Sequence, residues 1–160
     1  HVLLLNFPGG ADTIQSFDDI ARLKRQFPGL VVAPHPFFPS TCCLMGRLNR
    51  YAQVFDAVEY NAMYTASLNF NLPAERWARR HGVPMVGNGD VHLLEQLGTT
   101  YSLVDAERAP ASICAAIAAG RVRVVSHPLP LLTAIRLAAR VVASSRGWIQ
   151  VPPEPARAPM

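Results

Sequence analysis

The chain has few cysteines, little charge and no long apolar run, and each shortage excludes a class of protein. Its 160 residues include only three cysteines, and none of them forms a CxxC motif. We therefore expect a reducing, cytoplasmic location, no disulfide framework and no cysteine-based zinc site. No apolar run approaches the roughly 20 residues that span a bilayer, so we expect no membrane segment. No run of Lys or Arg indicates a nucleic-acid-binding arm.

The residues that are present suit a folded domain. Half of them are hydrophobic and 16% are charged, which gives enough apolar material for a core and too little charge for a disordered chain. The formal net charge is +4, a mild excess that fits phosphate-bearing substrates and equally fits ordinary solubility. The sequence starts at His1 and enters an apolar run at once, so we expect that an upstream part is missing.

Short apolar runs alternate with longer segments of helical periodicity. Strands are predicted at 2–6, 30–33, 57–60, 84–87, 99–104 and 121–126, and helical segments at 16–27, 44–54, 72–80, 92–97, 110–119 and 131–143. This alternation favours an α/β fold with a parallel sheet, either closed as a barrel or open and doubly wound. The first loop matches neither Gly-rich phosphate-binding motif, which removes the main support for a nucleotide-binding open sheet.

Polar side chains with the chemistry of metal ligands follow three successive predicted strands. His35 follows the second strand. The third contains Glu59 and is followed by Asn61, and Asp90 and His92 follow the fourth. The carboxyl ends of parallel strands share one rim, where the functional residues of α/β folds gather. Imidazole and carboxylate groups bind Zn, Mn or Fe, and a D-x-H pair in extended chain presents both side chains on one face.

Each of these residues also has an ordinary structural explanation. A His before a proline, as at His35, is typical of a turn. Glu59 lies between Val58 and Tyr60 and fits a core carboxylate with satisfied hydrogen bonds, while Asn61 fits a turn cap. A single D-x-H pattern is also common. The joint placement of these residues at consecutive strand ends is what favours a shared site.

Three segments resemble the PHP (polymerase and histidinol phosphatase) family, in the family's order. They are VVAPHPF at 31–37, FDAVEYN at 55–61 and VGNGDVH at 86–92, the last followed by LGTTY at 97–101. The resemblance spans about residues 1 to 130. It implies that residues 1–145 are the C-terminal portion of a distorted seven-stranded (β/α) barrel of the PHP type with parallel strands. A flexible, proline-rich tail is expected at 146–160.

The resemblance also implies an activity, which is hydrolysis of phosphate esters by metal-activated water. Two or three divalent ions, Zn, Mn or Fe, are expected in the intact site. Glu59 and Asn61 are expected to orient ligands or hold the strand end. The substrate is expected to be a phosphorylated small molecule, a nucleotide or an oligonucleotide. The ligands that the resemblance implies are His1, His35, Asp90 and His92.

The chain also departs from the family pattern. The first-strand H-x-H motif is absent, Gly89 and Val91 replace the usual Ser and Ala, and His81 and His127 match no ligand. Because the four remaining ligands cannot complete a two- or three-metal site, catalysis is expected of the intact protein. The alternative is a non-catalytic PHP-like structural or regulatory domain that lacks a complete metal site. A barrel hydrolase of C–N bonds is a third, less favoured interpretation.

Overall fold

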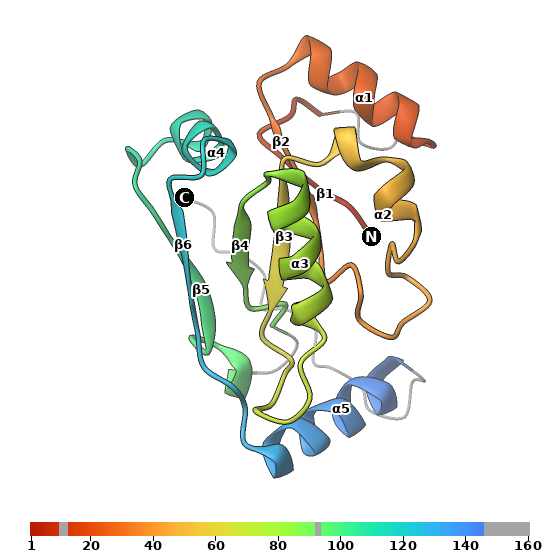
Figure 1. Cartoon of the computed structure of the whole chain (residues 1–160), viewed down its shortest axis with the longest axis vertical. Coiled ribbons are helices and arrows are strands. Elements are labelled where there is room, and N and C mark those ends of the chain that lie inside the picture. The colour runs from red at the N-terminus through yellow and green to blue at the C-terminus, as the bar shows by residue number, and fades with distance from the viewer. Residues whose placement is uncertain (10–12, 92–93, 146–160) are drawn as a thin grey trace, which may run out of the picture.

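The computed structural model describes residues 1–9, 13–91 and 94–145, which form a mixed α/β fold (Figure 1). None of the described helices is both long and apolar enough to cross a membrane. The elements, in chain order, are β1 (Leu3–Leu5), α1 (Phe17–Gln26), β2 (Leu30–Ala33), α2 (Arg47–Arg50), the 3-10 turn η2 (Ala52–Val54), β3 (Ala57–Asn61), α3 (Asn71–His81), β4 (Met85–Asn88), the 3-10 turn η3 (Leu94–Gln96), β5 (Thr100–Val104), α4 (Pro110–Ala118), β6 (Val122–Ser126) and α5 (Leu131–Ser145).

Local signals in the sequence place several helix ends correctly. Ser16 caps α1 in a reciprocal capping box with Asp19, which satisfies backbone N–H groups that have no partner within the helix. Gly82 ends α3 with a left-handed φ of 68°, a conformation that costs glycine little. The helix predicted at 44–54 is instead two short pieces, α2 and η2. The predicted tail at 146–160 lies outside the described residues.

A four-stranded sheet with the order β1-β2-β3-β4 forms the centre of the molecule. Strands β2, β3 and β4 run parallel, with Ala33 opposite Val58 and Asn61 opposite Asn88. This confirms the predicted α/β class with a mostly parallel sheet. The carboxyl ends of these three strands therefore lie at one edge, as the prediction of a shared rim requires.

Two strand pairs are antiparallel, and here the expectation of uniformly parallel strands was wrong. β1 pairs antiparallel with β2, and β5 pairs antiparallel with β6. Each connection contains a helix, but the second strand of the pair starts at the same end of the sheet at which the first strand stops. Hydrogen bonds close both connections, from Asn6 Nδ2 to Pro28 O and from Asp105 N to Arg121 O. The described strands therefore form a four-stranded and a two-stranded sheet and do not by themselves complete a barrel.

Both faces of the central sheet are covered, as expected for parallel strands. All four residues of β2 are buried. Val31 and Ala33 pack with side chains of α2, η2 and α3, including Leu48 and Trp77. Leu30 and Val32 belong to a second cluster, on the other face, with Cys114 and Ile117 of α4. Burial on both faces of the sheet therefore explains why every residue of β2 is apolar.

The β5–β6 pair is fastened to β4 through a side chain. The hydroxyl of Ser102 accepts a hydrogen bond from Gly87 N at 2.8 Å and donates one to Gly87 O at 3.0 Å. A Cβ added at Gly87 would lie 2.6 Å from the carbonyl oxygen of Tyr101 and 3.0 Å from Val124 Cγ1. The absence of a side chain at Gly87 therefore permits the close approach of the two sheets.

We predict that Gly87→Ala lowers the free energy of unfolding by about 1–3 kcal/mol, because the methyl group meets rigid backbone. Gly46→Ala is the matched control, since an added Cβ there meets nothing within 4 Å. The control is expected to stay within about 0.5 kcal/mol of the parent. Urea unfolding followed by circular dichroism measures both, and equal stability of the two variants would contradict the prediction.

Candidate functional site

The predicted site residues gather at the carboxyl ends of β2, β3 and β4. A cavity of about 220 Å³ opens there, between the strand ends and the loop that follows β2. A larger hollow of about 930 Å³ is lined by residues of α3 and β6 and contains Glu75, Arg79 and Arg123 but no His or Cys. The smaller cavity is therefore the candidate site. Its polar lining consists of His1, His35, Ser40, Cys42, Asn61, Asp90 and Gln96.

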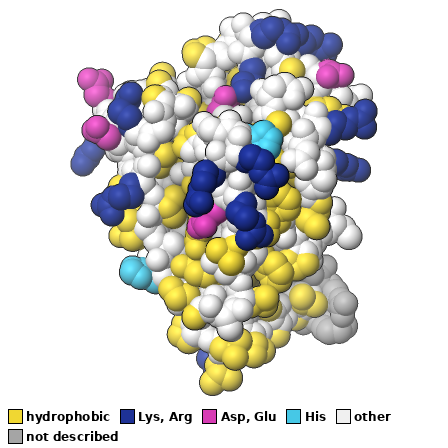
Figure 2. Space-filling view, in the orientation of Figure 1, with side chains coloured by type: hydrophobic (Ala, Val, Ile, Leu, Met, Phe, Trp, Pro, Cys, Tyr) yellow, Lys and Arg dark blue, Asp and Glu magenta, His cyan; other side chains and the backbone are white. Residues whose placement is uncertain are grey.

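The basic side chains do not gather at this cavity. Figure 2 shows Lys and Arg side chains clustered over the face that carries α3, with hydrophobic side chains below them. The last turn of α3 contains Arg79 and Arg80, and neither residue lines the candidate cavity. The chemistry available in the cavity is that of nitrogen, oxygen and sulfur donors.

Glu59 fixes both the backbone and the ring of His35. Its side chain, on the neighbouring strand β3, is buried, with the residue 1% exposed. Glu59 Oε2 accepts a hydrogen bond from His35 N at 2.5 Å and lies 2.8 Å from His35 Nδ1. Because a carboxylate only accepts, Nδ1 carries the proton of this contact. The lone pair of Nε2 is then the one that a metal ion can use.

Two of the predicted ligands have a left-handed backbone. His35 has φ 26° and Asp90 has φ 42°, values that cost residues other than glycine about 1–3 kcal/mol each. His35 is held in this conformation by the bond from its own N–H to Glu59. Strain of this kind persists only where surrounding contacts determine it, and it clusters at functional sites.

Asn61 connects Asp90 to the end of β3. Asn61 Nδ2 donates to Asp90 Oδ2 at 3.1 Å, and Asn61 Oδ1 accepts from Met63 N at 2.7 Å. Asp90 Oδ2 in turn lies 3.7 Å from His35 Nδ1. The structure therefore brings His35, Glu59, Asn61 and Asp90 together, as the strand-end argument predicted. His92, the other member of the predicted D-x-H pair, lies outside the described residues.

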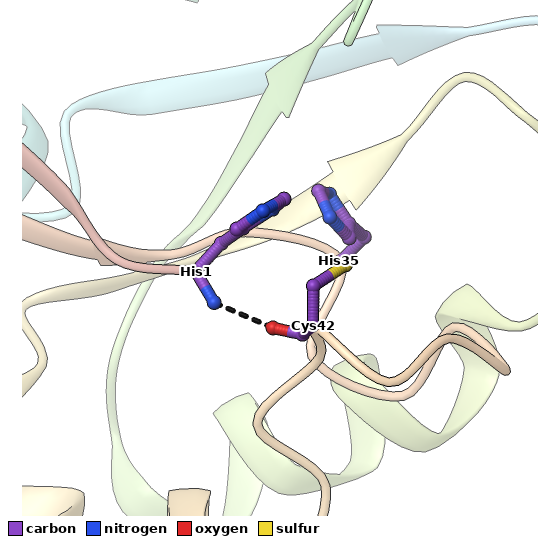
Figure 3. Close-up of side chains that lie close together, drawn as sticks. All are labelled: His1, His35 and Cys42. Carbon is purple, nitrogen blue, oxygen red and sulfur yellow. Dashed lines mark hydrogen bonds between the residues drawn. The ribbon is translucent and has the colours of Figure 1, made fainter. Parts of the chain in front are cut away.

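His1 and Cys42 complete the cluster on the other side of His35 (Figure 3). The His1 and His35 rings meet edge to face, with centroids 5.6 Å apart. The backbone nitrogen of His1 donates to Cys42 O at 2.5 Å. One donor atom from each of His1, His35 and Cys42 lies within 4.8 Å of the other two. Sequence reasoning missed Cys42, because its distance from His35 along the chain matches no metal-binding motif.

The surroundings of His35 and Cys42 favour the charged form of each side chain. Burial alone lowers the pKa of His35, but the hydrogen bond and charge of Glu59, together with the charge of Asp90, outweigh burial and raise it. The pKa of Cys42 is lowered, mainly by a hydrogen bond with Ser40, whose Oγ lies 3.1 Å from Cys42 Sγ. Burial raises the pKa of Cys43 to about 11. Of the two adjacent thiols, Cys42 is therefore the more readily ionised.

Comparison with known proteins supports the resemblance. Residues 69–122 match the PHP-associated family, over a segment that begins just before α3 and ends at the start of β6. No curated protein matches the chain. PsfC from Pseudomonas syringae PB-5123 has a similar fold, with a TM-score of 0.54 and 18% sequence identity over 89% of this chain. The match covers 55% of the PsfC chain, so this chain spans about half the length of that protein.

We predict that Glu59→Gln lowers the pKa of His35 in the metal-free protein, because the variant removes the charge that stabilises the protonated ring. In the parent, the folded-state pKa lies above the ordinary value of 6.5. Protonated His35 then stabilises the fold below about pH 6.5, and this contribution is lost as the pH rises through the folded-state value. NMR titration of the ring protons measures the shift.

Glu75→Gln is the control for this titration, since Glu75 lines the other hollow and its loss should leave His35 unchanged. An unaltered His35 pKa in Glu59→Gln would contradict the prediction.

Proposed function

We propose that the intact protein hydrolyses phosphate esters with divalent metal ions. The match of residues 69–122 to the PHP-associated family supports this proposal. Residues 1–145 would form the C-terminal portion of its PHP domain. The observation that carries the proposal is the convergence of His1, His35 and Asp90 on one cavity. The proposed ligands are His1, His35, Asp90 and His92.

The donor chemistry of the cavity fits such ions. Imidazole nitrogen and carboxylate oxygen suit Zn, Mn and Fe. The contact between Glu59 and His35 Nδ1 is the one that metal-ligating histidines use to fix their tautomer and ring orientation. Asn61 has the corresponding effect on Asp90, since its amide holds Oδ2 in place.

When bound, the ions would supply Lewis acidity at the phosphoryl oxygens and lower the pKa of a water. The residues of this chain would contribute positioning. Glu59 keeps a proton on Nδ1 of His35, so that in the neutral ring Nε2 is the nitrogen that faces a metal ion with a lone pair. Glu59 restricts His35 and Asn61 restricts Asp90 through hydrogen bonds. These two proposed metal ligands are therefore held in place before a metal ion binds.

We further propose that the missing ligands, including the H-x-H motif, belong to a part of the protein outside this sequence. In PsfC the matched region is 55% of the chain. Upstream strands would complete the distorted seven-stranded barrel around β2, β3 and β4. The proposal includes a cytoplasmic location and a phosphorylated small molecule, nucleotide or oligonucleotide as substrate.

A second candidate is a non-catalytic PHP-like module. It is favoured by the small number of predicted ligands that the described part of the chain brings to the cavity, namely His1, His35 and Asp90. The two candidates differ in whether the intact protein retains metal ions and hydrolyses a phosphate ester.

We predict that Asp90→Ala and His92→Ala each lower phosphatase activity of the full-length protein by at least about 100-fold, because loss of a metal ligand exceeds the 10–100-fold effect of losing an outer hydrogen bond. Hydrolysis of p-nitrophenyl phosphate measures activity, and plasma mass spectrometry measures bound metal, which should fall with it. His127→Ala, at an exposed position, is the control and should retain both. Full activity in both ligand variants would refute the proposed site, and a parent protein without metal or activity would favour the module.

A further inference from the structure

The cavity contains a thiol that the proposed ligand set does not use. Cys42 is exposed, whereas Cys43 and Cys114 are buried. Its Sγ lies with a ring nitrogen of His1 and one of His35 in a group whose members are within 4.8 Å of one another. Figure 3 shows the side chains of His1, His35 and Cys42 close together, although His1 comes from a different part of the chain than the other two.

The loop positions Cys42 through several hydrogen bonds. Met45 N donates to Pro36 O at 2.9 Å, which closes the loop on itself, and Cys43 N donates to Ser40 O at 3.2 Å. His1 N holds Cys42 O from the opposite side. These hydrogen bonds fix the backbone on both sides of Cys42, and the thiol lies near the two imidazoles.

We propose that Cys42 is a metal ligand together with His1 and His35, and that these three residues form a zinc-selective subsite of the proposed metal centre. The inference rests on the proposed function, because it assumes that the centre binds divalent ions. Thiolate is a soft ligand that favours Zn²⁺ over Mn²⁺ or Mg²⁺, and zinc sites commonly combine Cys sulfur with His nitrogen.

The separations fit a tetrahedral ion after a small movement. Zinc bonds of about 2.0–2.3 Å at tetrahedral angles place donor atoms about 3.5 Å apart. Since the donor atoms lie within 4.8 Å of one another, they need to approach by at most about 1.3 Å to reach this separation. Since His1 and Cys42 are exposed, rotation of their side chains provides this movement without changing the core.

Cobalt substitution tests the inference in the full-length protein. Co²⁺ bound to a thiolate gives an intense near-ultraviolet charge-transfer band, which nitrogen and oxygen ligands do not give. We predict this band in the parent, its loss in Cys42→Ser, and its retention in Cys43→Ser, the matched control with a buried thiol. Cys42→Asp, which restores a ligand without sulfur, should bind cobalt without the band.

Metal affinity provides the second measurement. Cys42→Ser should weaken Zn²⁺ binding by at least about tenfold and Mn²⁺ binding by less than about twofold, because only the softer ion gains from sulfur. A parent protein that binds cobalt without a charge-transfer band would overturn the inference and leave the proposed function intact. A band that survives in Cys42→Ser would also overturn the inference. A parent that binds no Co²⁺, Zn²⁺ or Mn²⁺ would overturn both.

Discussion

The carboxylate of Glu59 is the group on which the rest of the site depends. A buried carboxylate is destabilising by several kcal/mol unless it is paired and hydrogen-bonded, and Glu59 is 1% exposed. Its bonds to the backbone and ring of His35 satisfy it. The same bonds hold His35 at a φ of 26°, which the chain would otherwise avoid. The same hydrogen bonds therefore both stabilise the buried carboxylate and orient the histidine.

A second set of contacts extends this arrangement to Asp90. Asn61 N donates to Asn71 Oδ1 at 2.8 Å, and Asn71 Nδ2 donates to Asn61 O at 2.9 Å. This reciprocal pair fastens the end of β3 to the start of α3, so the Asn61 amide that holds Asp90 has a fixed position. Asn71 and Asp90 lie inside the PHP-associated match, whereas His35 and Glu59 precede it. The site is therefore assembled across the boundary of the matched segment.

The sequence predicts those parts of the structure that depend on local patterns. Apolar runs predict the strands, and the polar residues at or after their ends, His35, Glu59, Asn61 and Asp90, do meet at one edge of the sheet. The two explanations considered for Glu59, a satisfied core carboxylate and a group that orients a ligand, describe the same contact. Helical periodicity could not reveal that the connections around α1 and α4 return to their starting end, because that outcome depends on closures such as Asn6 to Pro28. Cys42 was missed for the same reason, since only the folded loop brings it to His1 and His35.

A thiolate in the proposed centre has a chemical consequence. Sulfur donates more charge to an ion than nitrogen or oxygen does, so an ion held by Cys42, His1 and His35 would be a weaker Lewis acid than one held by carboxylate and imidazole. Activation of water would then fall to an ion on the Asp90 side of the cavity, where the donors are oxygen and nitrogen. The Cys42 side would serve mainly to retain an ion and to set the electrostatic potential at the cavity. Since His35 is close to both Cys42 and Asp90, its fixed tautomer would matter to both halves of the centre.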